Sequence, residues 1–181
     1  MTVQTPDLFN DLLRSLDNAR RQHSLAVGHK VASVAHLVPA FLRADLVAAA
    51  TLHDIGYSSP STGHHAIDGA ALLAERGFSG VVCNLVAHHS ASTFEAVQRG
   101  LSLSEYERFA VDVDLAEAQS VLWWADMTTG PSGSTVTVED RLLEICSRYG
   151  EHDLVTQFID RARPVLLAAG QSPLSSSHGS V

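Results

Sequence analysis

Residues 50–70, ATLHDIGYSSPSTGHHAIDGA, carry three histidines and two aspartates. The apolar residues before His53 recur with helical spacing, and the segment behind Gly56, which is rich in Ser, Pro and Gly, interrupts that pattern. The stretch therefore predicts a helix that ends near His53 and a second helix that starts near His64. Neighbouring residues on a helix point about 100° apart, so His53 and Asp54 do not share a face.

Helical spacing continues on both sides of this stretch. A first helix is expected from Pro6, with Thr5 as its N-cap. The pattern predicts further helices over residues 24–38, 42–55, 64–76, 80–89, 115–127, 138–149 and 153–169. Gly56 is expected to close one of them in the left-handed conformation. Since no segment alternates for long with the period of a strand, the prediction is an all-α, single-domain helical bundle of about seven to nine helices. It spans residues 1–170, and the polar residues 171–181 form a disordered tail.

Composition and charge exclude several classes of protein. The chain has 181 residues, of which 45% are hydrophobic, and a formal net charge of −8 with Lys30 as the only lysine. A binder of nucleic acid or of an anionic membrane needs a basic surface, so neither partner is expected. The chain has no apolar run of the roughly 18 residues needed to span a membrane, and its first residues do not read as a secretory signal. Cys83 and Cys146 lack metal or redox spacing and are interpreted as free thiols of a cytoplasmic protein, either a monomer or a homodimer.

The histidines indicate a metal site. Five of the ten fall between His53 and His89, as two His-His pairs and one His-Asp pair. A single histidine on an apolar face is usually an ordinary core residue, but this density within one short span is not ordinary. Neutral imidazole and carboxylate are ligands of borderline and hard divalent cations, and no thiolate-rich site competes with them.

Five segments in order carry a resemblance to a known family: RRQHSLAV (20–27), LHDIG (52–56), HAIDGA (65–70), LVAHHS (85–90) and WADMTTG (124–130). Together they resemble the HD-domain superfamily of metal-dependent phosphohydrolases, in the branch that holds two metal ions through six ligands. The resemblance implies the all-α HD-domain fold and a dinuclear centre. The expected ions are iron or manganese, ahead of cobalt, nickel, zinc and magnesium.

The resemblance also implies which residues bind the metals: His23, His53, Asp54, His65, His89 and Asp126. Three of these positions have competitors in the sequence. His29 lies six residues after His23 and about 240° around the same helix, so both do not serve one site easily. His64 reads as a solvent-exposed residue at a helix start. His88 competes with His89 and is otherwise expected either to support a metal ligand or to contact the substrate.

The implied activity is hydrolysis of a phosphate ester of a nucleotide or a similar small metabolite by a metal-bound hydroxide. His53, Asp54 and His88 are the predicted catalytic residues. The sequence contains no serine or cysteine nucleophile motif and no glycine-rich phosphate loop. The predicted substrate-binding residues are Arg20, Lys30, Arg99 and Thr129.

The alternative activity is that of an HD-fold dinuclear iron oxygenase, which cleaves a C–H or C–P bond with similar ligands. Members that cleave organophosphonates carry Tyr and Glu before the first ligand. This chain has no Tyr before Tyr57 and no Glu before Glu75, which disfavours that alternative. A non-enzymatic binding module is disfavoured because the ligand set is complete.

Overall fold

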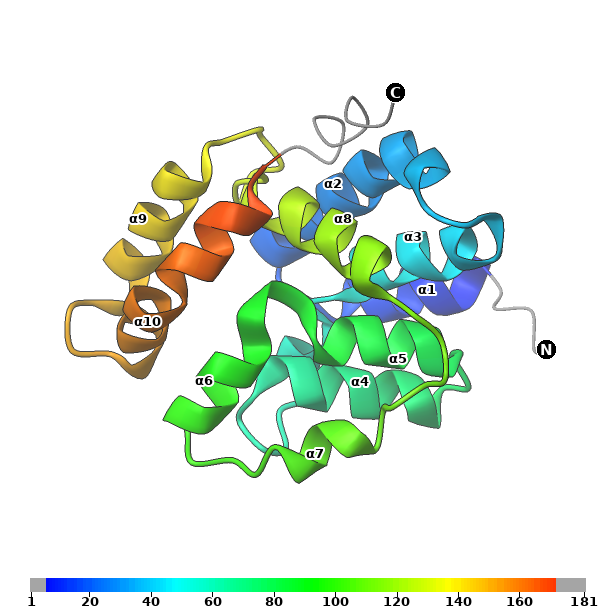
Figure 1. The fold of residues 1–181 in the computed structure, drawn as a ribbon, viewed down its shortest axis with the longest axis horizontal. Coiled ribbons are helices and arrows are strands. Elements are labelled where there is room, and N and C mark those ends of the chain that lie inside the picture. The colour runs from blue at the N-terminus through cyan, green and yellow to red at the C-terminus, as the bar shows by residue number, and fades with distance from the viewer. Residues whose placement is uncertain (1–5, 172–181) are drawn as a thin grey trace, which may run out of the picture.

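The computed structural model describes residues 6–171, and these residues form an all-α fold, as predicted (Figure 1). The α-helices are α1 (Pro6–Arg14), α2 (Asn18–Val34), α3 (Arg43–Leu52), α4 (His65–Glu75), α5 (Gly80–Ala87), α6 (Ser92–Gln98), α7 (Ser104–Glu107), α8 (Ala116–Met127), α9 (Val138–Tyr149) and α10 (Leu154–Ala169). Four 3-10 helices join them: η1 (Ala35–Leu37), η2 (Ala40–Leu42), η3 (Ile55–Ser58) and η4 (His89–Ala91). Within residues 6–171, no helix combines the length and apolar character that crossing a bilayer requires.

Several helix boundaries differ from the prediction. The ten α-helices of the described residues exceed the predicted seven to nine, because the short helices α6 and α7 were missed. Helix α2 begins at Asn18 and not near residue 24, since the Asp17 side chain caps it by accepting from the Arg20 N–H. The predicted Thr5 cap and the tail beyond Gln171 lie outside the described residues. Cys83 and Cys146 are free thiols, as predicted.

The main core joins α2, α3, α4, α5 and α8. Its fully buried side chains include Val27 and Val31 of α2, Leu46 of α3 and Leu122 of α8. Helices α2 and α3 approach closely at Gly28, where an added Cβ would lie 2.2 Å from the Thr51 hydroxyl oxygen. This packing sets the register between α2 and the end of α3.

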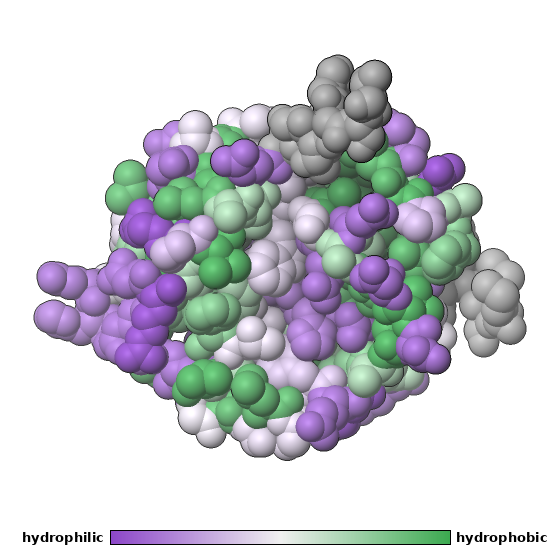
Figure 2. Space-filling model, in the orientation of Figure 1, coloured by the Kyte–Doolittle hydropathy of each residue, from purple (hydrophilic) through white to green (hydrophobic). Residues whose placement is uncertain are grey.

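Helices α9 and α10 form a hairpin at one side of this bundle (Figure 1). A smaller apolar core fastens it to the body, with Met127 of α8 packed among residues of both hairpin helices such as Leu142 and Ile159. The side chain of Gln98 in α6 also donates to that of Gln157 in α10 at 2.7 Å. Figure 2 shows that the tip of the hairpin, the exposed connection near residues 150–152, is hydrophilic and projects from the body.

Gly56 does not adopt the predicted left-handed conformation. It lies within η3, and its φ is not among the positive values in the chain. The glycine is needed for a different reason, because a Cβ at this position would lie 1.9 Å from the His65 carbonyl oxygen and 2.5 Å from the Gly69 nitrogen. The absence of a side chain lets η3 lie against the first turn of α4, which brings Asp54 and His65 close together.

Candidate metal centre

The structure brings together six side chains that the sequence analysis assigns as ligands, although up to 103 residues separate them in the chain. All but His65 are buried, and the His65 side chain is 15% exposed. They come from five elements or their ends: His23 from α2, His53 and Asp54 from the end of α3, His65 from α4, His89 from η4 and Asp126 from α8.

Two groups of potential ligand atoms overlap at His53. One group is His23, His53 and Asp126, and the other is His53, Asp54 and His89; within each, the ligand atoms lie within 4.8 Å of one another. Asp126 Oδ1 lies 3.0 Å from His23 Nε2 and 3.6 Å from His53 Nε2. Such spacing suits side chains that share cations and do not simply pack against each other.

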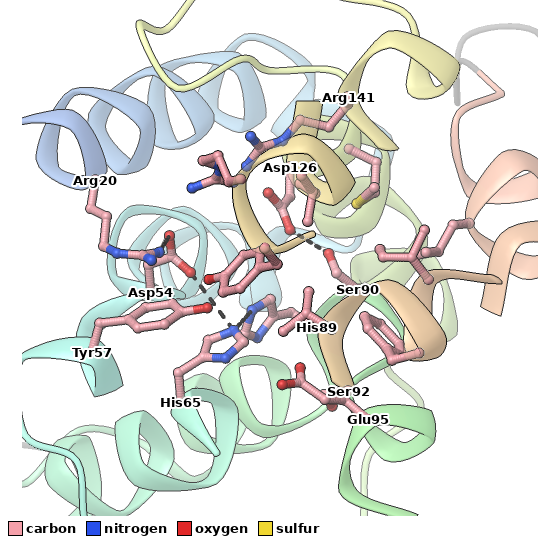
Figure 3. Close-up of a pocket in the computed structure, with 18 residues that line it drawn as sticks. Arg20, Asp54, Tyr57, His65, His89, Ser90, Ser92, Glu95, Asp126 and Arg141 are labelled. Carbon is pink, nitrogen blue, oxygen red and sulfur yellow. Dashed lines mark hydrogen bonds and ion pairs between the residues drawn. The ribbon is translucent and has the colours of Figure 1, made fainter. Parts of the chain in front are cut away.

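The second carboxylate completes the arrangement. Asp54 Oδ1 lies 3.7 Å from His53 Nε2 and 3.8 Å from His65 Nε2. The Nε2 atoms of His65 and His89 are 3.1 Å apart. Figure 3 shows Asp54, His65, His89 and Asp126 converging on the same end of a cavity.

Backbone carbonyls fix the tautomers of three of the histidines. The Nδ1 atoms of His23, His53 and His89 lie 3.2, 2.9 and 2.6 Å from the carbonyl oxygens of Gly130, Ala50 and Val86. A carbonyl oxygen can only accept, so each Nδ1 carries a proton and donates it. In the neutral ring, Nε2 then presents a lone pair to the centre, as metal-binding histidines commonly do.

His53 provides the test of whether cations fit here. Its Nε2 is buried and has no hydrogen-bond partner among the described residues. The atoms that surround it are carboxylate oxygens of Asp54 and Asp126, which are acceptors. A buried lone pair that faces two carboxylates is unfavourable unless a proton or a metal cation lies between them. Two imidazole-rich groups with carboxylates therefore fit divalent cations.

The electrostatics of the centre favour ionised carboxylates at Asp54 and Asp126 and neutral imidazoles at His65 and His89. Burial alone would raise the pKa of Asp54, but the nearby His53, His65 and His23 outweigh it and lower that pKa below its ordinary value. The pKa of Asp126 is likewise lowered, because His53 and His23 outweigh burial. Burial and neighbouring imidazoles lower the pKa of His89 to about 3. The His89 ring is therefore neutral throughout the physiological range, the form in which an imidazole binds a metal ion.

His53 is the exception, and it leads to a prediction about pH. Burial alone would lower its pKa, but Asp54 and Asp126 outweigh burial and raise the pKa to about 9. In the metal-free protein at pH 7 its Nε2 is protonated, and a divalent cation must displace that proton. We expect roughly one proton to be released per chain on Mn²⁺ binding at pH 7, and the apparent affinity to rise with pH until about pH 9. Calorimetry in buffers of different ionisation enthalpy measures this number.

The same raised pKa of His53, about 9 against an ordinary 6.5, fixes the sign of its effect on folding. In the metal-free protein it stabilises the fold fully below about pH 6.5 and loses that contribution as pH rises through about 9. Mn²⁺ binding without proton release at pH 7 would contradict the raised pKa of His53.

The turn after His89 is strained. Ser90 and Ala91 have φ values of 46° and 60°, in the left-handed region, which costs a non-glycine residue about 1–2 kcal/mol. This turn directs the Ser90 hydroxyl to the centre, where it donates to Asp126 Oδ2. Ser90 thereby orients a ligand. Sequence analysis noted no role for it, since nothing in the residue type indicates a left-handed turn.

Ser90→Ala is expected to weaken Mn²⁺ binding by about 10-fold, because Asp126 loses the donor that orients it. Equilibrium dialysis measures the affinity. Ser90→Gly removes the same hydroxyl but relieves the strain, so it should bind Mn²⁺ as weakly while being about 1 kcal/mol more stable than the alanine variant. Unchanged affinity in both variants would show that Asp126 needs no such support.

The three competing histidines lie outside the cluster. His29 is exposed on α2. His64 is fully buried, so its expected exposure to solvent is wrong; its Nε2 lies 3.0 Å from the Ser92 carbonyl oxygen. His88 packs its ring against Tyr106, with centroids 4.8 Å apart, and does not line the cavity. Its predicted contact with substrate gains no support from this placement.

Of the four predicted substrate-binding residues, only Arg20 lines the cavity. Its guanidinium lies 3.5 Å from Asp54 Oδ2 and covers the Tyr57 ring. The Lys30 ammonium instead donates to the carbonyl and hydroxyl oxygens of Thr128 at 2.9 and 2.6 Å. Arg99 pairs with Glu95 at 2.7 Å, and the Thr129 hydroxyl donates to the Ala125 carbonyl at 2.6 Å. These three side chains are committed to contacts that leave them away from the cavity.

The cavity beside the cluster measures about 660 Å³, counting the space that opens to solvent. Its ligand-bearing end includes Asp54, His65, His89 and Asp126, and its other walls come largely from α9 and α10 (Figure 3). A smaller opening of about 240 Å³ lies next to it. Three arginines line both spaces: Arg20, Arg141 and Arg148. Sequence analysis missed the last two, because an arginine on an amphipathic helix carries no local sign that it faces a distant site.

Fold and site together define an all-α protein with a buried centre for divalent cations, built from imidazoles and carboxylates. The chain matches the HD domain family over residues 20–122, more than half of its 181 residues, and it belongs to that family. The matched segment ends before Asp126 and before the hairpin of α9 and α10. No curated protein and no solved structure matches the chain.

Proposed function

We propose that this HD-domain protein hydrolyses the phosphate ester of a small molecule with the help of two divalent ions. Its family belongs to the superfamily of metal-dependent phosphohydrolases. The observation that carries the proposal is the unpartnered Nε2 of His53, which faces the carboxylates of Asp54 and Asp126 in a buried site. The cavity beside it opens to solvent and is lined both by these two carboxylates and by Arg20, Arg141 and Arg148.

The residues that would hold the two ions are His23, His53, Asp54, His65, His89 and Asp126. Divalent ions bound there would lower the pKa of water and neutralise charge on a phosphate oxygen. Three of the four histidines, His23, His53 and His89, are held by the carbonyls of Gly130, Ala50 and Val86, so these side chains are already oriented. Burial of the ligands keeps competing water from the ligand atoms.

Arginines supply the cationic groups that a phosphate needs beyond the metals. Arg20 and Arg141 reach toward the two carboxylates from different sides of the cavity (Figure 3). Arg141 is 8% exposed, and its Nε has no hydrogen-bond partner among the described residues. Its Nη1 is fixed by Glu144 at 2.6 Å, which leaves the Nε edge of the guanidinium unpaired. A non-bridging phosphate oxygen is a suitable acceptor for such a buried donor.

Arg141→Met should lower kcat/KM for a hydrolysed ester by about 10- to 100-fold, mainly through KM, because a charge-assisted hydrogen bond to phosphate is lost. The fold should survive, since Glu144 keeps its contact with Arg148 at 2.7 Å. Arg163→Met is the matched control, because Arg163 lies on α10 with its side chain 37% exposed and does not line the cavity. A KM unchanged in Arg141→Met would remove this residue from the site.

The proposed function is tested with metal-depleted protein reloaded with Mn²⁺ or Fe²⁺. Metal analysis should give two ions per chain, and the loaded protein should release inorganic phosphate from esters in a panel of nucleotides, sugar phosphates and aryl phosphates. Ferrous protein that consumes oxygen in the presence of an organic substrate, without releasing phosphate from any ester, would instead show the oxygenase activity. Protein that binds no divalent ion would overturn both.

A further inference from the structure

We infer that the hairpin of α9 and α10 selects phosphate esters of apolar alcohols, aryl or branched alkyl, over nucleotides and glycerol or sugar phosphates. The inference rests on the proposed function and specifies its substrate class. It comes from the distribution of side chains around the cavity, which has polar groups near the metal ligands and an apolar wall contributed mainly by α10 of the hairpin.

The apolar wall consists of large aliphatic and aromatic side chains: Met127, Ile145, Val155, Phe158, Ile159 and Leu166. All except Met127 belong to α9 or α10. Phe158, Ile159 and Leu166 are buried and form the base of the wall, while Ile145 and Val155 are only half-buried. The half-buried pair therefore keeps apolar surface that a ligand could cover.

Polar side chains also line the cavity. Besides the metal ligands they include Arg20, Arg141 and Arg148, which suit an anion, and the hydroxyl-bearing Tyr57, Ser90, Ser92 and Tyr149. Arg141, Arg148 and Tyr149 come from α9, so the apolar part of the wall belongs mainly to α10. Glu95 also lines the cavity but is paired with Arg99 at 2.7 Å. The backbone donors and acceptors of a helical wall are largely engaged within the helices themselves. A base edge or a sugar hydroxyl placed against Ile145 and the apolar side chains of α10 would thus lose its hydrogen bonds to water without replacement.

An apolar group placed there binds more favourably, because both its own apolar surface and that of the wall are removed from water. The expected size of the preference is limited. Apolar pockets reject a group that merely adds a hydroxyl by about 10²-fold at most. We therefore expect kcat/KM for an aryl phosphate to exceed that for glycerol phosphate or AMP by about 10- to 100-fold.

The wall lies beyond the segment that matches the family, which ends at residue 122. The hairpin is nevertheless fixed against the body by the small core around Met127 and Leu142 and by the side-chain hydrogen bond between Gln98 and Gln157. The apolar side chains of this wall face the metal-ligand cluster. When the phosphate of an ester lies at the cluster, the wall is therefore positioned to contact the alcohol part of the ester.

The experiment compares 1-naphthyl phosphate, glycerol 3-phosphate and AMP on the full-length, Mn²⁺-loaded protein. Two readouts are taken: kcat/KM from phosphate release, and the equilibrium affinity of each compound. The unmodified protein should favour 1-naphthyl phosphate in both. Ile145→Asn should lower kcat/KM and affinity for 1-naphthyl phosphate by about 10-fold while leaving glycerol 3-phosphate unchanged.

The matched control is Leu143→Asn, since Leu143 lies on the same helix but is 61% exposed and does not line the cavity. Val155→Thr is a nearly isosteric second variant and provides the test if Ile145→Asn fails to fold. It should also lose kcat/KM and affinity for 1-naphthyl phosphate while leaving glycerol 3-phosphate unchanged. Equal affinity for the three compounds, or an equal loss for all of them in Val155→Thr, would overturn the inference.

The two readouts separate this inference from the proposed function. Phosphate release with no preference for the naphthyl compound would leave the hydrolase intact and refute the role of the hairpin. Selective binding of 1-naphthyl phosphate, lost in Val155→Thr, without phosphate release from any ester would support the hairpin and contradict hydrolysis.

Discussion

Protein with Asp54→Ala is expected to hold no more than one divalent ion per chain and to release phosphate more than about 10²-fold more slowly than the unmodified protein. Asp54 lies 3.7 Å from His53 Nε2 and 3.8 Å from His65 Nε2, between the two parts of the cluster. Loss of a residue that only orients a ligand already costs about 10- to 100-fold in affinity or activity, and loss of the ligand itself should cost more. Metal analysis and phosphate release measure the effect.

A thermal readout separates lost metal binding from lost folding. Mn²⁺ should raise the Tm of the unmodified protein, because it binds the folded state only, and should raise it much less in Asp54→Ala. Asp112→Ala is the control, since Asp112 is an exposed carboxylate in the loop after α7 and does not line the cavity. Asp54→Ala protein that keeps two ions and full activity would end the case for this centre.

Gly56→Ala is expected to lower the free energy of unfolding by about 3 kcal/mol and to weaken metal binding at the same time. The new Cβ would lie 1.9 Å from the His65 carbonyl oxygen and 2.5 Å from the Gly69 nitrogen. Both are backbone atoms, so no side chain can rotate away, and the start of α4 must move. Because His65 is the first residue of α4, the movement also displaces a ligand. Urea denaturation and Mn²⁺ titration measure the two effects.

Gly77→Ala provides the comparison. Gly77 has a φ of 76°, and an added Cβ there would meet no heavy atom within 4 Å apart from those of its own chain neighbours. The substitution should therefore cost only about 1–2 kcal/mol of backbone strain and leave Mn²⁺ affinity unchanged. Equal urea midpoints for Gly56→Ala and Gly77→Ala would show that η3 and α4 can move apart without loss of stability.

The sequence predicts the ligands better than their surroundings. His53 and Asp54 occur in a dipeptide, and His23, His65 and His89 occur in segments whose order is informative, so the cluster could be proposed without coordinates. Gly56 illustrates the limit. A glycine after the His-Asp pair was noticed, but one sequence does not distinguish a glycine needed for positive φ from one needed for close contact between backbones. The structure shows close contact.

Residues that act at long range were harder to predict. Arg20, His23 and Lys30 share a face of α2, as their spacing indicates, yet Lys30 is held by Thr128, 98 residues away in the chain. Arg141 reaches the cavity from a helix whose sequence shows only ordinary amphipathic spacing. Helix α7 has four residues, too few for a period to be recognised. In each case the deciding contact is tertiary, and no local pattern encodes it.

The carbonyls that hold His53 and His89 have a consequence for how cations are acquired. Ala50 and Val86 lie in the final turns of α3 and α5, where helix carbonyls have no partner within the helix. Each imidazole thus donates a hydrogen bond to a carbonyl at the end of a helix, and the same hydrogen bond orients the imidazole. Folding alone should therefore place the metal-binding side chains in position, and divalent ions should bind with little rearrangement of the chain. Small zinc modules differ, because metal binding drives their folding. One ion could then exchange for another in the finished molecule, and cellular supply would decide which is carried.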